Sequence, residues 1–183
     1  MAEPRNRYST VSLALHWVIA VAILTQVLLI TAHENTEGPL SGQFVMLHKS
    51  VGITILVLTL ARIGWRLAHP AIPLPAEMRR WEKWAARATH VLFYVVLIAM
   101  PMTGWLASSA AGREIALFGL FDWPLLPVSG GRETAGRLME VHELVMKGFY
   151  LLIALHVLGA LKHQFIDRDN VLHRMIPLIP RRP

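Results

Sequence analysis

The most informative stretch of this 183-residue sequence is VHELVMKGFYLLIALHVLGALKH, residues 141–163. Its only charged side chains before Lys162 are Glu143 and Lys147, and both lie in its first two helical turns. A helix needs about 20 mainly apolar residues to cross a lipid bilayer. This stretch therefore predicts a membrane-spanning helix over about residues 139–163.

Three further segments have the same character. Residues 8–33 and 88–112 contain no Asp, Glu, Lys or Arg, and residues 46–67 carry charge only near their ends. Runs of this length leave no polar face for a helix in a soluble bundle, so we favour a membrane protein. We expect an all-α membrane protein with one domain over residues 1–183, a four-transmembrane-helix bundle with spans at about 11–32, 45–67, 88–110 and 139–163.

Composition and charge agree with that fold class. Hydrophobic residues make up 54% of the chain and charged residues 16%, against about 25% charged residues in soluble domains. The absence of cysteine excludes disulfides and thiolate-ligated zinc or iron–sulfur sites. Thirteen of the eighteen Lys and Arg residues flank one side of the predicted bundle, which by the positive-inside rule places both termini in the cytoplasm. The net charge of +6 reflects this asymmetry and does not indicate a nucleic-acid partner.

Four of the nine histidines lie inside the predicted spans, where ionisable side chains usually mark function. His142 and His156 are fourteen residues apart, so they share one face of their helix and lie about 21 Å apart along its axis. His48 matches His142 in depth near the periplasmic side. His16 matches His156 near the cytoplasmic side.

Two histidine pairs at two depths are what two bis-histidine haems require, and such haems favour electron transfer because no coordination position stays open. Without a C-x-x-C-H motif the haems would be non-covalent b-type haems. Gly52 and Gly159 follow His48 and His156 by about one turn and would leave room for a porphyrin. Two other interpretations are a set of helix–helix hydrogen bonds and a haem-free, histidine-lined transporter for a metal or proton.

Several motifs resemble the prokaryotic cytochrome b561 family of small di-haem inner-membrane proteins, which includes a bacterial superoxide oxidase. The matching stretches are LHW (15–17), LHKSVGITILVLTLARIGWRL (47–67), HVLFYVVLIAMPMTGW (90–105), VHELVMKGFYLLIALHVLGALKH (141–163) and DNVLHRMIP (169–177). The resemblance implies a periplasmic haem held by His48 and His142, and a cytoplasmic haem held by His16 and His156. His90 stays open as an alternative to His156, because the eukaryotic b561 proteins spread their ligands over four helices.

The resemblance also implies an oxidoreductase of the bacterial inner membrane that oxidises superoxide at the periplasmic side and passes the electrons to ubiquinone near the cytoplasmic haem. We expect His163, Arg7 and Arg80 near the quinone, and Lys49 and Lys147 to bind haem propionates or attract a small anion. The alternative is an electron-transfer subunit that docks a periplasmic redox partner on residues 111–138. The expected partners are therefore lipid, quinone, and superoxide or another electron donor.

Overall fold

Four long helices dominate the computed structural model, which describes residues 8–70, 72–176 and 178–179. They are α1 (Thr10–Glu34), α2 (Pro39–Ala68), α3 (Arg80–Ala110) and α4 (Gly131–Lys162). Helix α4 continues into a π-helical turn, η1 (His163–Asp167), and a 3-10 turn, η2 (Leu172–Arg174), follows. All four long helices have the length and hydropathy needed to cross a membrane, which confirms the expected helical membrane architecture.

Three helices begin earlier than hydropathy predicts, at residues 39, 80 and 131 rather than at about 45, 88 and 139. Local sequence explains two of these early starts, those of α2 and α3. Pro39 suits the first helical turn because that position needs no backbone N–H. In α3 the Glu82 carboxylate accepts the Arg79 backbone N–H at 3.1 Å, one half of a capping box. Hydropathy locates the part of a helix inside hydrocarbon, whereas caps determine where the helix begins.

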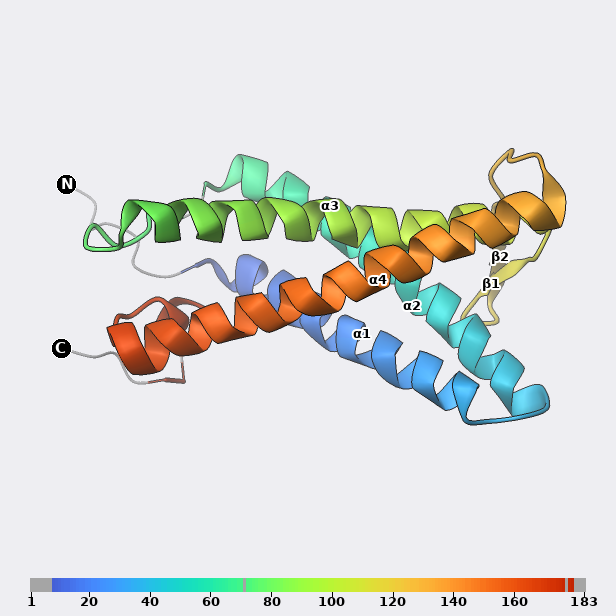
Figure 1. Cartoon of the computed structure of the whole chain (residues 1–183), viewed down its shortest axis with the longest axis horizontal. Helices are drawn as coiled ribbons and strands as arrows, with labels where there is room; N and C mark the ends of the chain where they lie inside the picture. Colours follow the sequence, from blue (N-terminus) through green and yellow to red (C-terminus); the bar gives the residue numbers. More distant parts are fainter. Residues whose placement is uncertain (1–7, 71, 177, 180–183) are drawn as a thin grey trace.

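The helices pack as two antiparallel hairpins (Figure 1). Helix α1 packs along α2, helix α3 packs along α4, and the two hairpins meet mainly between α2 and α3. The start of α1, the α2–α3 connection and the turns η1 and η2 lie at one end, which we name the basic end. The α1–α2 turn and the segment between α3 and α4 lie at the other end, which we name the hairpin end.

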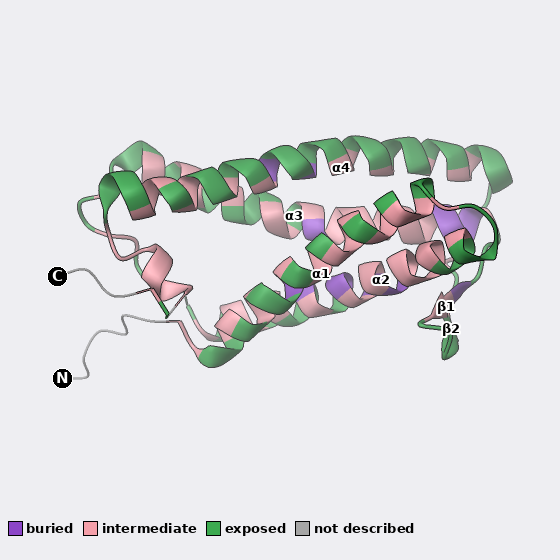
Figure 2. Ribbon diagram, turned by 90° about the horizontal axis from the view of Figure 1, so that it is seen from below, coloured by how far each residue is buried: buried purple, intermediate pink, exposed green. Residues whose placement is uncertain are grey.

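An apolar core lies midway along the bundle. The buried side chains there come from all four helices: Ile19, Ile55, Leu97, Phe149 and Leu152. By contrast, many apolar side chains on the outer faces are exposed, for example Leu28 at 70% and Leu151 at 63% (Figure 2). An apolar exterior of this kind suits contact with lipid, because lipid chains solvate it as well as a protein core does.

A β-hairpin between α3 and α4 is a regular element that the sequence did not predict. Strand β1 (Ile115–Leu117) pairs antiparallel with β2 (Phe121–Trp123), and Gly119 supplies a positive φ of 71° in the turn. The fully buried Ser50 hydroxyl of α2 accepts the Phe118 backbone N–H at 2.8 Å, and Ile115 is only 2% exposed. These contacts hold the β-hairpin against α2 at the hairpin end.

The C-terminal turns are held against the basic end of the bundle. The Trp17 indole of α1 donates to the Met175 carbonyl at 3.0 Å, and the Arg174 guanidinium donates to the Pro73 carbonyl at 2.7 Å. The segment after α4 therefore contacts both the beginning of α1 and the α2–α3 connection.

Candidate functional site

The first histidine pair joins α2 and α4 near the hairpin end. The His48 and His142 rings have their centroids 6.4 Å apart, with an angle of 74° between the ring planes. Both side chains are half-buried. The pair bridges two helices that belong to different hairpins, so the site depends on the assembled bundle.

Helix α3 orients the His142 ring. Its Nδ1 lies 3.0 Å from the Met100 carbonyl oxygen and 2.9 Å from the Thr103 hydroxyl. A carbonyl can only accept, so the Met100 contact requires Nδ1 to be the protonated nitrogen, which leaves Nε2 with a free lone pair. A Cβ at Gly104 would lie 3.4 Å from Cε1 of this ring, so the glycine lets the ring approach α3 closely. Histidines that bind metals commonly make such a hydrogen bond to a backbone carbonyl.

Helix α1 supports the His48 side of the pair. The Gln26 amide donates to the His48 backbone carbonyl at 3.0 Å, and a Cβ at Gly52 would lie 3.0 Å from the same amide nitrogen. Gly52 thus allows Gln26 to approach α2. The His48 Nδ1 atom is buried without a hydrogen-bond partner among the described residues. Buried polar atoms normally have partners, so this ring is suited to a bound group.

The second histidine group lies toward the basic end and contains three rings. The His16 and His156 centroids are 6.3 Å apart, and the His90 and His156 centroids are 5.8 Å apart. The Nδ1 of His90 donates to the Ala86 carbonyl at 2.6 Å, within its own helix. Phe93 packs edge-on against His156, with the two ring centroids 5.0 Å apart. The arrangement brings His16, His90 and His156 together and leaves both partners of His156 possible on proximity alone.

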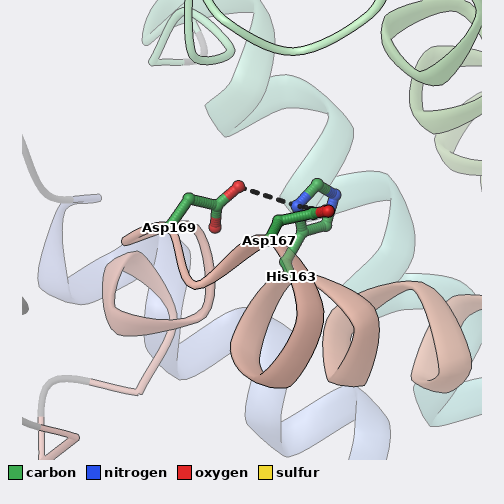
Figure 3. A group of neighbouring side chains, drawn as sticks. All are labelled: His163, Asp167 and Asp169. Atoms are coloured by element: carbon green, nitrogen blue, oxygen red, sulfur yellow. Dashed lines mark hydrogen bonds and ion pairs between the residues drawn. The ribbon is translucent and has the colours of Figure 1, made fainter.

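A polar cluster follows at the end of α4 (Figure 3). The His163 Nδ1 lies 2.8 Å from an Asp169 oxygen and 3.1 Å from an Asp167 oxygen. The Lys162 ammonium pairs with Asp167 at 2.6 Å and with Glu82 of α3 at 2.9 Å. The two aspartates and the histidine could exchange protons with a ligand beside them, and Lys162 balances part of their negative charge.

The remaining predicted residues are more scattered. Lys49 donates to the Glu114 carbonyl at 3.3 Å and lines an open cavity of about 290 Å³ with Gly42, Val45, Met46, Glu114 and Ala116. Lys147 is exposed and makes no hydrogen bond or ion pair within the described part of the chain. A Cβ at Gly159 would meet open space, and Arg80 is the exposed first residue of α3. Arg7 lies outside the described residues.

Comparison with known proteins identifies the family. The family model described as prokaryotic cytochrome b561 matches residues 7–178. The chain belongs to the prokaryotic cytochrome b561 family. This result confirms the resemblance inferred from the sequence motifs.

Three curated relatives align along nearly their whole length. The "Cytochrome b561 homolog 2" of Escherichia coli (strain K12) is 34% identical over 177 residues, which cover 93% of this chain and 92% of the relative. The "Probable superoxide oxidase CybB" of Yersinia pestis is 28% identical, with 94% and 97% covered. The "Cytochrome b561 homolog 1" of Escherichia coli (strain K12) is 29% identical, with 94% and 98% covered. Membership of this family, together with four helices able to cross a membrane, makes this chain a multi-pass membrane protein that transfers electrons. Family membership also implies a b-type haem.

The ring separations test whether the histidines fit a haem iron. A metal-bound imidazole nitrogen lies about 2.0–2.1 Å from its metal, and bond lengths near 1.35 Å put the ring centre roughly 1.1–1.2 Å behind that nitrogen. Two imidazoles on opposite sides of one iron would then have centroids about 6.2–6.6 Å apart. The separations of 6.3 Å for His16 and His156 and 6.4 Å for His48 and His142 fit this value. The separation of 5.8 Å for His90 and His156 is shorter.

Sequence reasoning missed the residues that orient the ligand candidates. Thr103, the Met100 carbonyl and Gln26 all contact a histidine-bearing helix from another helix. A small polar residue close to a proline and a glycine inside a membrane helix, as at residues 101–104, was the available signal.

Proposed function

We propose that this cytochrome b561 family member carries electrons across the membrane through two b-type haems. His48 and His142 would hold one haem at the hairpin end, and His16 and His156 would hold the other toward the basic end. The observation that carries this proposal is the ring separation of each pair, 6.4 Å and 6.3 Å, which fits two imidazoles sharing one iron. Of the two rings beside His156, His16 has the fitting separation and His90, at 5.8 Å, lies closer, so we propose His16 and His156 as the ligands.

The proposed reaction is the oxidation of superoxide with the reduction of ubiquinone. Two superoxide anions, one ubiquinone and two protons give two oxygen molecules and one ubiquinol. The support for superoxide is the relative from Yersinia pestis, which is named a probable superoxide oxidase and aligns with 94% of this chain. When bound, the haems supply the one-electron carriers that link the two half-reactions.

The residues at the hairpin end would attract superoxide and orient the haem ligand His142. With two histidines on each iron no coordination position stays open, so the electron would be taken up at the haem edge. Lys49 and the nearby Arg113 bring two positive charges against the one negative charge of Glu114 at the cavity, and a net positive charge raises the local concentration of a small anion. The Met100 carbonyl and Thr103 keep the His142 ring in the tautomer that ligates iron.

The residues at the basic end would serve the quinone. A quinone needs one proton for each electron it accepts, and His163 with Asp167 and Asp169 forms a protonatable group at that end. Arg80, at the beginning of α3, and Arg7 remain weaker quinone candidates. By the positive-inside rule this end faces the cytoplasm, so we propose a bacterial inner-membrane orientation with both termini there.

The test combines haem content with activity of the purified chain. We expect two b-type haems per chain in a pyridine haemochrome assay, and reduction of a soluble ubiquinone analogue by enzymatically generated superoxide. His142→Ala should reduce the haem content to one per chain. His33→Ala, which alters a histidine near the end of α1 that contacts Ser41 at 2.7 Å, should keep both haems. A purified chain without haem would refute the proposal and favour the haem-free transporter.

A second candidate function is a subunit that receives electrons from a periplasmic redox protein. The exposed apolar side chains of the β-hairpin favour it: Leu120 is 80% exposed, Phe121 55% and Phe118 44%. Apolar patches of this kind are common where another protein docks. The isolated chain separates the two candidates, because an enzyme reduces quinone with superoxide alone and a subunit requires its partner.

A further inference from the structure

Helix α2 repeats the residue spacing of the proposed ligands on α4, with an arginine in place of the second histidine. On α4, His142 and His156 are fourteen residues apart, with the buried Phe149 midway between them. On α2, fourteen residues separate His48 from Arg62, and the buried Ile55 lies midway. Residues seven and fourteen apart share one helix face. Arg62 is therefore on the inward face of α2, at the level of the second histidine group.

The contacts of Arg62 agree with this position. Its guanidinium donates to the Ser12 backbone carbonyl of α1 at 3.1 Å, and Ser12 lies one helical turn before His16. The charge is close enough to interact electrostatically with His16, His90 and His156. The side chain is half-buried. The guanidinium thus lies beside the histidine group of the basic end.

Arg62 has no carboxylate partner among the described residues. Three acidic groups at this end are engaged elsewhere, since Glu82 and Asp167 pair with Lys162 and Asp169 pairs with His163. A charged side chain within a membrane-spanning segment is costly and normally pairs with an opposite charge. The Ser12 carbonyl accepts only one of the five hydrogen bonds that a guanidinium can donate. The carbonyl carries no net charge, so it does not neutralise the guanidinium.

We propose that Arg62 binds a propionate of the haem held by His16 and His156 and raises the reduction potential of that haem. The inference rests on the proposed function, because that haem supplies the anion. A haem carries two carboxylates, and a guanidinium matches a carboxylate in charge and in hydrogen-bond geometry. Reduction adds one negative charge to the haem, so a nearby cation in a poorly solvated site favours the reduced form. The arrangement directs electrons to the haem beside the proposed quinone site.

The experiment is a spectroelectrochemical redox titration of three variants in detergent: Arg62→Gln, Arg62→Lys and Arg87→Gln. Arg87 is an exposed arginine of α3 at the same end and serves as the matched control. Each variant is also made in a His142→Ala background, in which the haem at His16 and His156 is observed alone. Haem content per chain is measured in parallel.

We expect Arg62→Gln to shift the reduction equilibrium of the basic-end haem about tenfold toward the oxidised form, which is about 59 mV for one electron. The haem at His48 and His142 should keep its reduction potential. Arg62→Lys should keep the basic-end haem close to the potential of the parent protein, and Arg87→Gln should leave the potentials of both haems unchanged. Loss of only the basic-end haem in Arg62→Gln, with retention in Arg62→Lys, would also support the propionate contact.

Two results would overturn the inference while leaving the proposed function intact. One is a two-haem Arg62→Gln protein that titrates like the parent. The other is an Arg87→Gln protein that shifts as far as Arg62→Gln. A parent protein without haem would instead refute the proposed function itself, so the two failures are distinguishable.

Discussion

The hydroxyl of Thr103 offers a sharp test of how α3 controls the His142 ring. Thr103→Val removes the oxygen that lies 2.9 Å from His142 Nδ1 and keeps nearly the same side-chain volume. The Met100 carbonyl, 3.0 Å from the same nitrogen, remains as an acceptor. The variant therefore weakens the orientation of the ring without abolishing it.

The size of the effect follows from what is lost. One neutral hydrogen bond contributes about 0.5–1.5 kcal/mol, which corresponds to about a two- to tenfold change in an equilibrium constant. Loss of the supporting partners of a metal ligand commonly costs about 10–100-fold in affinity. Because one of the two partners of Nδ1 survives in this variant, we expect the smaller of these two effects. One haem per chain should be lost about two- to tenfold faster.

The assay follows haem transfer from the purified protein to an excess of an apo-globin. Thr25→Val is the matched control, because the Thr25 hydroxyl donates only to the Val21 carbonyl of its own helix, at 3.0 Å. The control should release haem at the parent rate. Equal rates for Thr103→Val and the parent, or faster loss of both haems in Thr103→Val, would refute the reasoning.

Three further outcomes are expected. His156→Ala should remove one haem per chain whereas His90→Ala keeps both, as measured by pyridine haemochrome; the reverse result would make His90 the ligand. Asp169→Asn should slow ubiquinone reduction severalfold at unchanged haem content, because this carboxylate contacts a protonatable ring at 2.8 Å, and an unchanged rate would exclude a role in proton delivery. Ser50→Ala should lower the free energy of unfolding by about 1–3 kcal/mol, because it leaves the Phe118 N–H without its partner; an unaltered thermal melting curve would contradict this.

The sequence predicts the helices and the histidine depths well because both depend on local patterns. Charge-free runs locate hydrocarbon spans, and the fourteen-residue spacing places His142 and His156 on one face of a helix without knowledge of any neighbour. The early beginning of α3 was not predictable in this way. It depends on the cap formed by Arg79 and Glu82, whose side chains count only as charges in a hydropathy profile.

The sequence alone did not predict side-chain contacts between helices that are distant in the chain. Gly52 was expected to make room for a porphyrin, and the structure puts the Gln26 amide against it. The Thr103 hydroxyl meets His142 from 39 residues away. Arg62 was counted only as one of the cytoplasmic charges. No periodicity within α2 or α3 reveals these partners, because each contact is created by the packing of one helix on another.

The apolar core between the two histidine levels has a consequence for energy conversion. The five buried side chains of this layer are all apolar and carry no exchangeable proton. Electrons can tunnel through such a layer, whereas protons cannot hop through it. On the proposed direction each electron would cross the layer without a compensating proton, and the protons for quinol would be taken from the opposite side to the donor. The reaction would then generate a transmembrane voltage, and this voltage would in turn affect the rate of the reaction.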